Sequence, residues 1–109
     1  MENCEYTTLH HNEYGYVIQC RNCTGFQVAF GNIMLHLQTE EYKALSDYLW
    51  LLHSNHSETE EPEVKKILVP TDSRKVTMVF SVLETERFYD LLQQAKLMQQ
   101  VYHTLENKN

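Results

Sequence analysis

The sequence predicts an α+β fold built from two antiparallel β-hairpin units, each followed by an α-helix, with a zinc-ribbon-like hairpin at the N-terminus. Three observations predict it. Short apolar stretches of strand period occur before residue 38 and again between residues 65 and 80. Each set is followed by apolar residues spaced by three and four, the period of a helix. A Cys-x-x-Cys pair, Cys20 and Cys23, precedes the clearest hairpin.

That hairpin spans residues 26–37. Gly31 and Asn32 form a two-residue turn of type II′, whose twist suits paired strands. The expected cross-strand pairs are Phe26–Leu37, Gln27–His36, Val28–Leu35, Ala29–Met34 and Phe30–Ile33. A shift of one residue would turn the apolar side chains to the opposite face, so the sequence specifies this register strongly.

An earlier hairpin is expected from residues 6–10 and 15–20, joined by residues 11–14. This arrangement places His10 opposite Gly15 and Thr7 opposite Ile18. Its extension brings Cys4 opposite Arg21, beside Cys20 and Cys23, and leaves His10 and His11 roughly 15–20 Å away at the other end. The three cysteines are therefore expected to converge without the histidines.

The cysteines Cys4, Cys20 and Cys23 are the candidate metal ligands. Their spacing is similar to that of a zinc ribbon, but Thr7 stands where a fourth thiolate is expected. Two alternatives stay open: one bound zinc ion completed by another ligand, or a degenerate ribbon that holds no metal and keeps reduced thiols. The cofactor prediction is accordingly none or one zinc.

The chain has 109 residues, which predicts a single domain. We expect residues 1–53 to form the first half, residues 54–64 an acidic surface loop, and residues 65–109 the second half. The first helix should begin with Thr39 as its N-cap and end near Leu52. A Ser-x-x-Glu capping box predicts that the second begins at Val82 and runs to about Leu105.

Two surfaces are candidates for contact with other proteins. Trp50 lies about 120° from the apolar stripe of the first helix, so an exposed tryptophan is expected. The second helix is about 36 Å long and should outrun the sheet that covers it. Its last apolar residues are Met98, Val101, Tyr102 and Leu105. We expect them to pack against a second copy in a homodimer; the alternative is fraying after Gln99.

The net charge of −6 argues against nucleic acid or an anionic membrane as the partner. No apolar run reaches the roughly 18 residues needed to cross a bilayer. The acidic N-terminus has no signal-peptide pattern, which predicts a cytoplasmic protein with reduced cysteines. No spacing of histidines, carboxylates or glycines indicates a catalytic site, so we do not expect an enzyme.

Several short stretches resemble a group of small uncharacterised bacterial proteins typical of Bacteroidetes. They are Cys4-Glu5, Cys20-x-x-Cys23, Phe30-Gly31-Asn32, Val69-Pro70-Thr71 and residues 91–97. The resemblance implies a domain of unknown function and supplies no activity. The leading functional hypothesis is a non-catalytic protein-binding or adaptor module with an unknown protein partner. The alternative is a zinc-ribbon-derived regulatory protein that acts with nucleic-acid or transcription machinery.

Overall fold

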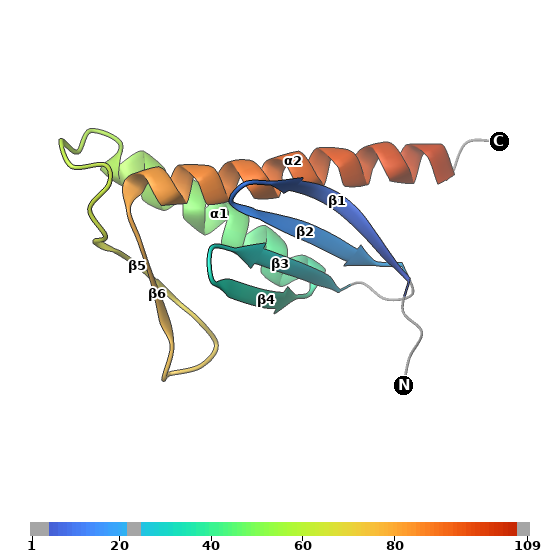
Figure 1. The fold of residues 1–109 in the computed structure, drawn as a ribbon, viewed down its shortest axis with the longest axis horizontal. Helices are drawn as coiled ribbons and strands as arrows, with labels where there is room; N and C mark the ends of the chain where they lie inside the picture. The colour runs from blue at the N-terminus through green and yellow to red at the C-terminus, as the bar shows by residue number, and fades with distance from the viewer. Residues whose placement is uncertain (1–4, 22–24, 107–109) are drawn as a thin grey trace.

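The computed structural model describes residues 5–21 and 25–106 and has the α+β architecture that the sequence predicts (Figure 1). A four-stranded antiparallel sheet has the order β1–β2–β3–β4, and β5 and β6 form a separate two-stranded sheet. The strands are β1 (Tyr6–Asn12), β2 (Gly15–Cys20), β3 (Phe26–Phe30), β4 (Ile33–Leu37), β5 (Ile67–Pro70) and β6 (Thr77–Phe80). The helices are α1 (Thr39–His56) and α2 (Val82–Glu106).

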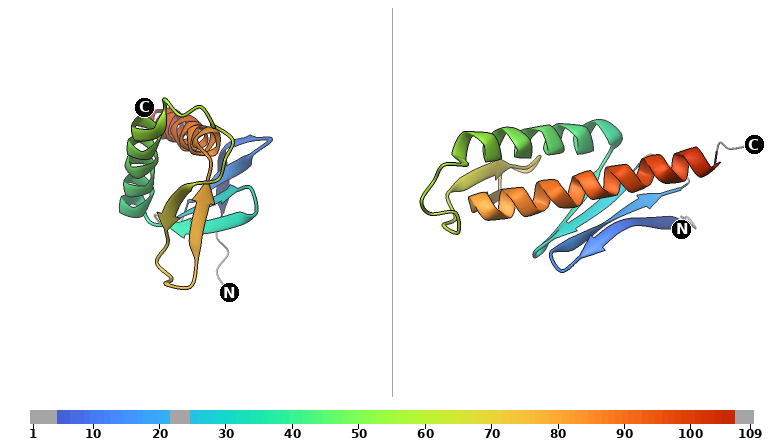
Figure 2. Two further views of the ribbon diagram at one scale, coloured as in Figure 1. Left: turned by 90° about the vertical axis from the view of Figure 1, so that its left-hand side faces the viewer. Right: turned by 90° about the horizontal axis from the view of Figure 1, so that it is seen from above.

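The two helices lie side by side, and the C-terminal part of α2 extends well past the N-terminal start of α1 (Figure 2). Their directions are opposite, because His53 contacts Glu86 while Ser46, nearer the start of α1, contacts Gln93, further along α2. The Tyr42 hydroxyl of α1 also donates a hydrogen bond to the Leu92 carbonyl oxygen of α2, at 2.7 Å. The molecule is therefore elongated, with principal extents of 51 × 30 × 24 Å.

The β3–β4 hairpin has the predicted register, with Phe30 opposite Ile33 and Phe26 opposite Leu37. Gly31 has a φ of 59°, and no non-glycine residue among those described has a positive φ. A positive φ at the first turn position only is the pattern of a type II′ turn, as predicted. Alternation places Phe26, Val28 and Phe30 in the core.

The predicted register of the β1–β2 hairpin is wrong. Asn12 pairs with Gly15, so the turn contains two residues and not four. The Asn12 Oδ1 atom accepts hydrogen bonds from the backbone N–H groups of Tyr14 at 2.8 Å and Gly15 at 3.2 Å, which closes the tighter turn. The register then shifts between Thr8 and His10, and Leu9 at this bulge is buried.

Three phenylalanines join the two sheets to α2 in the centre of the core. The rings of Phe30 and Phe88 stack with centroids 4.4 Å apart, and Phe80 meets both edge-on at 5.8 and 5.7 Å. Offset stacks and edge contacts of this kind stabilise by about 1 kcal/mol beyond the burial of the rings. The cluster fixes β3, β6 and the first half of α2 against one another.

Both helices begin with a capping box. The box at Ser81 and Glu84 is confirmed, with reciprocal bonds of 2.9 and 3.1 Å. In α1 the N-cap is Gln38 and not Thr39, because Gln38 forms the reciprocal bonds with Glu41. The helix also continues to His56, beyond the expected end at Leu52.

Gly15 sits where β2 approaches β3 too closely for any side chain. A Cβ atom at this position would lie 1.9 Å from the Ala29 carbonyl oxygen. We predict that Gly15→Ala lowers the free energy of unfolding by about 3 kcal/mol, measured by urea denaturation. Gly31→Ala is the control: it meets no atom and should cost only about 1 kcal/mol for its left-handed φ. Equal losses in the two variants would contradict this packing.

Glu84 gives the fold a dependence on pH. Burial opposes ionisation of its carboxyl group, but hydrogen bonds from Lys65 and Ser81 and the Lys65 charge outweigh it, so the pKa of Glu84 is lowered. The stabilisation is complete above the unfolded carboxyl pKa of about 4.3 and is lost as pH falls through the lower folded value. We predict that Glu84→Gln costs about 1 kcal/mol at neutral pH.

The measurement is urea denaturation of wild type and variant across the acidic range. The difference between them should shrink as pH falls below about 4. Glu63→Gln, in the exposed loop before β5, is the control and should leave the free energy of unfolding unchanged. A Glu84→Gln cost that stays constant down to low pH would contradict the lowered pKa.

Candidate functional site

The second half of α2 carries an apolar stripe that this chain does not cover. The last buried residue of the helix is Ala95, and every apolar side chain after it is exposed. The stripe, which we call the α2 tail stripe, consists of Leu97, Met98, Val101, Tyr102 and Leu105. Leu97, Val101 and Leu105 are 56%, 49% and 60% exposed, so they point away from the body of the molecule. The helix remains regular to Glu106 and does not end at Gln99.

Trp50 is exposed, as predicted, with 54% of its surface accessible. Its ring lies 5.3 Å from the ring of Tyr89 and 6.4 Å from that of His53, between centroids. Tyr89 is in the first half of α2, and Leu105 is some 24 Å further along the helix at 1.5 Å per residue. Trp50 and the α2 tail stripe are therefore two separate surfaces.

Cys20 ends β2 and is 4% exposed, opposite Tyr6 in the sheet. Its N–H donates to the Gly25 carbonyl, and the N–H of Arg21 donates to the Glu5 carbonyl. Cys20 is disulfide-bonded, so the expectation of a reduced thiol at this position is wrong. The other candidate ligands, Cys4 and Cys23, lie outside the described residues, and the three-thiolate site stays a prediction for the reduced chain only.

A polar cleft of about 500 Å³ lies between the last turns of α2 and the open end of the β1–β2 hairpin, where β1 begins and β2 ends. Arg21 is the cation of this cleft, and its guanidinium lies 3.9 Å from a Glu5 carboxylate oxygen and 3.6 Å from one of Glu106. All three side chains are more than half exposed, so these ion pairs contribute at most about 1 kcal/mol each. The cleft is lined by Thr7, Gln19, Cys20, Arg21, Gln99, Gln100, Tyr102, His103, Thr104 and Glu106.

A larger cleft, of about 880 Å³, lies between β4, the first half of α1 and the β5–β6 hairpin. We call it the β4 cleft. Most of its lining is apolar: Ile33, Met34, Leu35, Leu37, Ala44, Leu45, Tyr48, Val69, Pro70, Val76 and Met78. The remaining lining residues are His36, Glu41, Thr71, Asp72 and Ser73. The charged side chains of this lining are thus two carboxylates, Glu41 and Asp72, and His36 is its only basic side chain.

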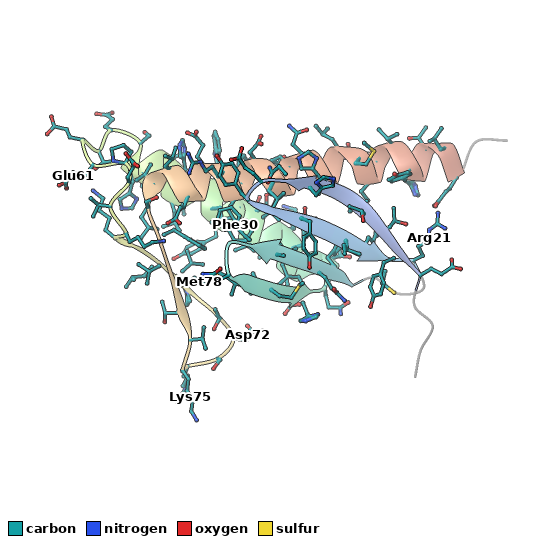
Figure 3. The ribbon with its side chains drawn as sticks, in the orientation of Figure 1. Arg21, Phe30, Glu61, Asp72, Lys75 and Met78 are labelled. Atoms are coloured by element: carbon teal, nitrogen blue, oxygen red, sulfur yellow. The ribbon has the colours of Figure 1, made fainter. Side chains whose placement is uncertain are left out.

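The basic residues do not form a groove. Arg21 lies at the end of β2, whereas Lys75 lies at the tip of the β5–β6 hairpin on the other side of the molecule (Figure 3). Arg74 is adjacent to Lys75 in the same turn. The common basic surface that would favour nucleic-acid binding is therefore not built from these three residues.

Two histidines of α1 have structural contacts. His53 lies 3.1 Å from a Glu86 carboxylate oxygen, and the His56 Nδ1 atom lies 2.9 Å from the Leu52 carbonyl oxygen near the end of α1. Within residues 5–21 and 25–106, no three His, Cys, Asp or Glu side chains are grouped as a metal ion requires. Neither helix over the same residues has an apolar stretch long enough to cross a membrane.

Sequence reasoning missed Leu97 and the β4 cleft. Leu97 could have been found, because it precedes Val101 and Leu105 by four and eight residues. The β4 cleft could not, because it depends on where the β5–β6 hairpin lies relative to β4. His36 pairs with Gln27, as predicted, and is exposed on the edge strand.

Comparison with known proteins gives one match. The model of a family described as "Family of unknown function (DUF6686)" matches residues 1–109. No curated protein and no solved structure matches the chain.

The state of Cys20 is open to direct measurement. We predict that iodoacetamide modifies Cys20 in the denatured chain only after a reducing agent has been added, because a disulfide sulfur is not nucleophilic. Peptide mass spectrometry with and without reduction reports the modification at this residue. Complete alkylation of Cys20 before reduction would contradict the disulfide, and zinc analysis of the reduced protein would then test the metal alternative.

Proposed function

The chain belongs to a family of unknown function, DUF6686, and from that premise we propose that it is a non-catalytic protein-binding module that acts as a homodimer. The observation that carries the proposal is the α2 tail stripe, five large apolar side chains on a regular helix that this chain leaves in water. Contiguous exposed apolar surfaces of this kind are typical of interaction sites.

A second copy is the occupant that the stripe fits best, because Leu97 and Leu105 are equally spaced on the two sides of Val101. If two tails pack antiparallel with Val101 at the two-fold axis, Leu97 of each lies beside Leu105 of the other. Apolar residues thus meet apolar residues along the proposed contact.

The contacts that Glu106 makes within one chain do not oppose this arrangement. Its ion pair with Arg21 at 3.6 Å lies in the polar cleft, on the side of α2 that faces away from Val101, so the proposed contact leaves it in place. The stripe alone is a small interface, so we expect a dimer that depends on protein concentration.

Dimerisation would give a binding module two identical copies of every other surface. Trp50 and the β4 cleft lie away from the tail and stay available in such a dimer. Two linked sites raise the apparent affinity for a partner that can engage both. We include in the proposal the bacterial origin that the resemblance implies and the zinc-ribbon ancestry of the N-terminal hairpin. The cytoplasmic location that the sequence predicts is also included, and it implies that the Cys20 disulfide is reduced in the cell.

The competing hypothesis, a zinc-ribbon-derived regulator that contacts nucleic acid, has less support. Arg21 lies between two carboxylates, and Lys75 is on the other side of the molecule. The net charge of −6 would repel a phosphate backbone.

A substitution that places a charge at the centre of the proposed interface tests the dimer. We predict that Val101→Glu weakens self-association at least tenfold, because the axis would bring two carboxylates together in an apolar contact. Light scattering over a range of concentrations measures it, and wild type should approach twice the 12.9 kDa of one chain.

Gln100→Glu is the matched control. It adds the same charge one residue away, on the side of α2 that faces the polar cleft. We expect its self-association to equal that of wild type. A wild-type chain that stays monomeric at its highest soluble concentration, or equal weakening in the two variants, would contradict the proposed dimer.

A further inference from the structure

We propose that the β4 cleft binds an extended segment of another protein, which adds to the free edge of β4 as a fifth strand and carries basic residues at its ends. The inference deepens the proposed function, because it names the form and chemistry of the partner. It does not depend on the dimer, which uses a different surface.

Within the part of the chain that the structure describes, the backbone of β4 has unpaired hydrogen-bonding groups on its outer side. In a hairpin with a two-residue turn, the closing pair is hydrogen-bonded, here Phe30 with Ile33. The N–H and C=O groups of Ile33, Leu35 and Leu37 therefore point toward β3. Those of Met34 and His36 point to the other side, where no strand of the described chain lies. They are available to an added strand.

The sequence of β4 contains none of the residues that usually protect an edge strand. Natural sheets block their edges with proline, charged residues, bulges or covering elements. The opposite edge, β1, has the bulge between Thr8 and His10 and lies against α2. The residues of β4 are Ile-Met-Leu-His-Leu, without proline, a carboxylate or a lysine, and their pairing with β3 is uninterrupted.

Open space lies beside this edge. An added strand would lie about 4.8 Å from β4, and its alternate side chains would enter the β4 cleft of about 880 Å³. There they would meet Leu45 of α1 and Val76 and Met78 of the hairpin. Val76 is 48% exposed, so burial against an incoming side chain would be favourable.

Charge selects among possible occupants. The charged side chains that line the cleft are Glu41 and Asp72, both carboxylates. Asp72 lies on the side of the hairpin turned toward β4, while Lys75 points away at the tip (Figure 3). A fatty acid or other anion would be repelled, whereas lysine or arginine next to an apolar strand would be attracted. A second β4 would bring two more carboxylates to the same cleft, so a different protein is favoured.

In the experiment, displayed short random peptides are selected for binding to the full-length chain. The selected peptides are then synthesised, and their affinities are measured by fluorescence anisotropy. The peptides should alternate apolar and other residues and carry lysine or arginine near an end. Wild type and Val101→Glu should bind them equally, which separates this inference from the dimer. Asp72→Asn should weaken binding, and Asp90→Asn, on the exposed side of α2, should not.

Backbone pairing is tested by one change in the chain and one change in the peptide. Met34→Pro removes one outward N–H while the bonds from β4 to β3 remain, and it should raise Kd at least tenfold. Met34→Ala keeps that N–H and should change Kd much less. If Met34→Pro does not fold, N-methylation of alternate peptide amides, measured on wild type, makes the same test and should weaken binding similarly.

Three results would overturn the inference. The first is that no peptide is enriched over background. The second is that N-methylated peptides bind wild type, or unmodified peptides bind Met34→Pro, as tightly as unmodified peptides bind wild type. The third is that Met34→Pro lowers residual self-association of Val101→Glu, because β4 would then pair with another copy of the chain.

Discussion

The stack of Phe30 on Phe88, closed by Phe80, is the interaction on which the rest of the structure depends. It is the point where the four-stranded sheet, the β5–β6 hairpin and α2 meet, with ring centroids 4.4 to 5.8 Å apart. A two-stranded hairpin is marginally stable alone, so β5–β6 relies on Phe80 and its neighbours in the core. The cluster also sets which part of α2 is buried, because Phe88 lies in the first half of the helix.

Both proposed interaction surfaces follow from this off-centre attachment. The helix α2 is held over Val82–Ala95, and the residues beyond Ala95 extend past α1 with their apolar side chains in water. The β5–β6 hairpin, held at its Phe80 end, projects beside β4 without pairing to it. The β4 cleft is the space left between them. One small core thus leaves a helical surface at one end and a strand edge at the other.

The sequence was most informative where structure is local. The pairs from Phe26–Leu37 to Phe30–Ile33 follow from alternation and one turn, and the Ser81–Glu84 box follows from a spacing of three. The β1–β2 register was mistaken because the Asn12 side chain closes a shorter turn. Helix period identified most of the α2 tail stripe. The β4 cleft depends on how far the hairpin stands from β4, which no local pattern encodes.

The central claim is that α2 is stabilised in two different ways, by the core up to Ala95 and by another protein surface beyond it. Amide hydrogen exchange along α2 at several protein concentrations tests this most directly. We expect residues 85–95 to be protected at every concentration, and residues 97–105 to gain protection as concentration rises. Uniform protection that does not change with dilution, or a tail that exchanges freely at all concentrations, would contradict the claim.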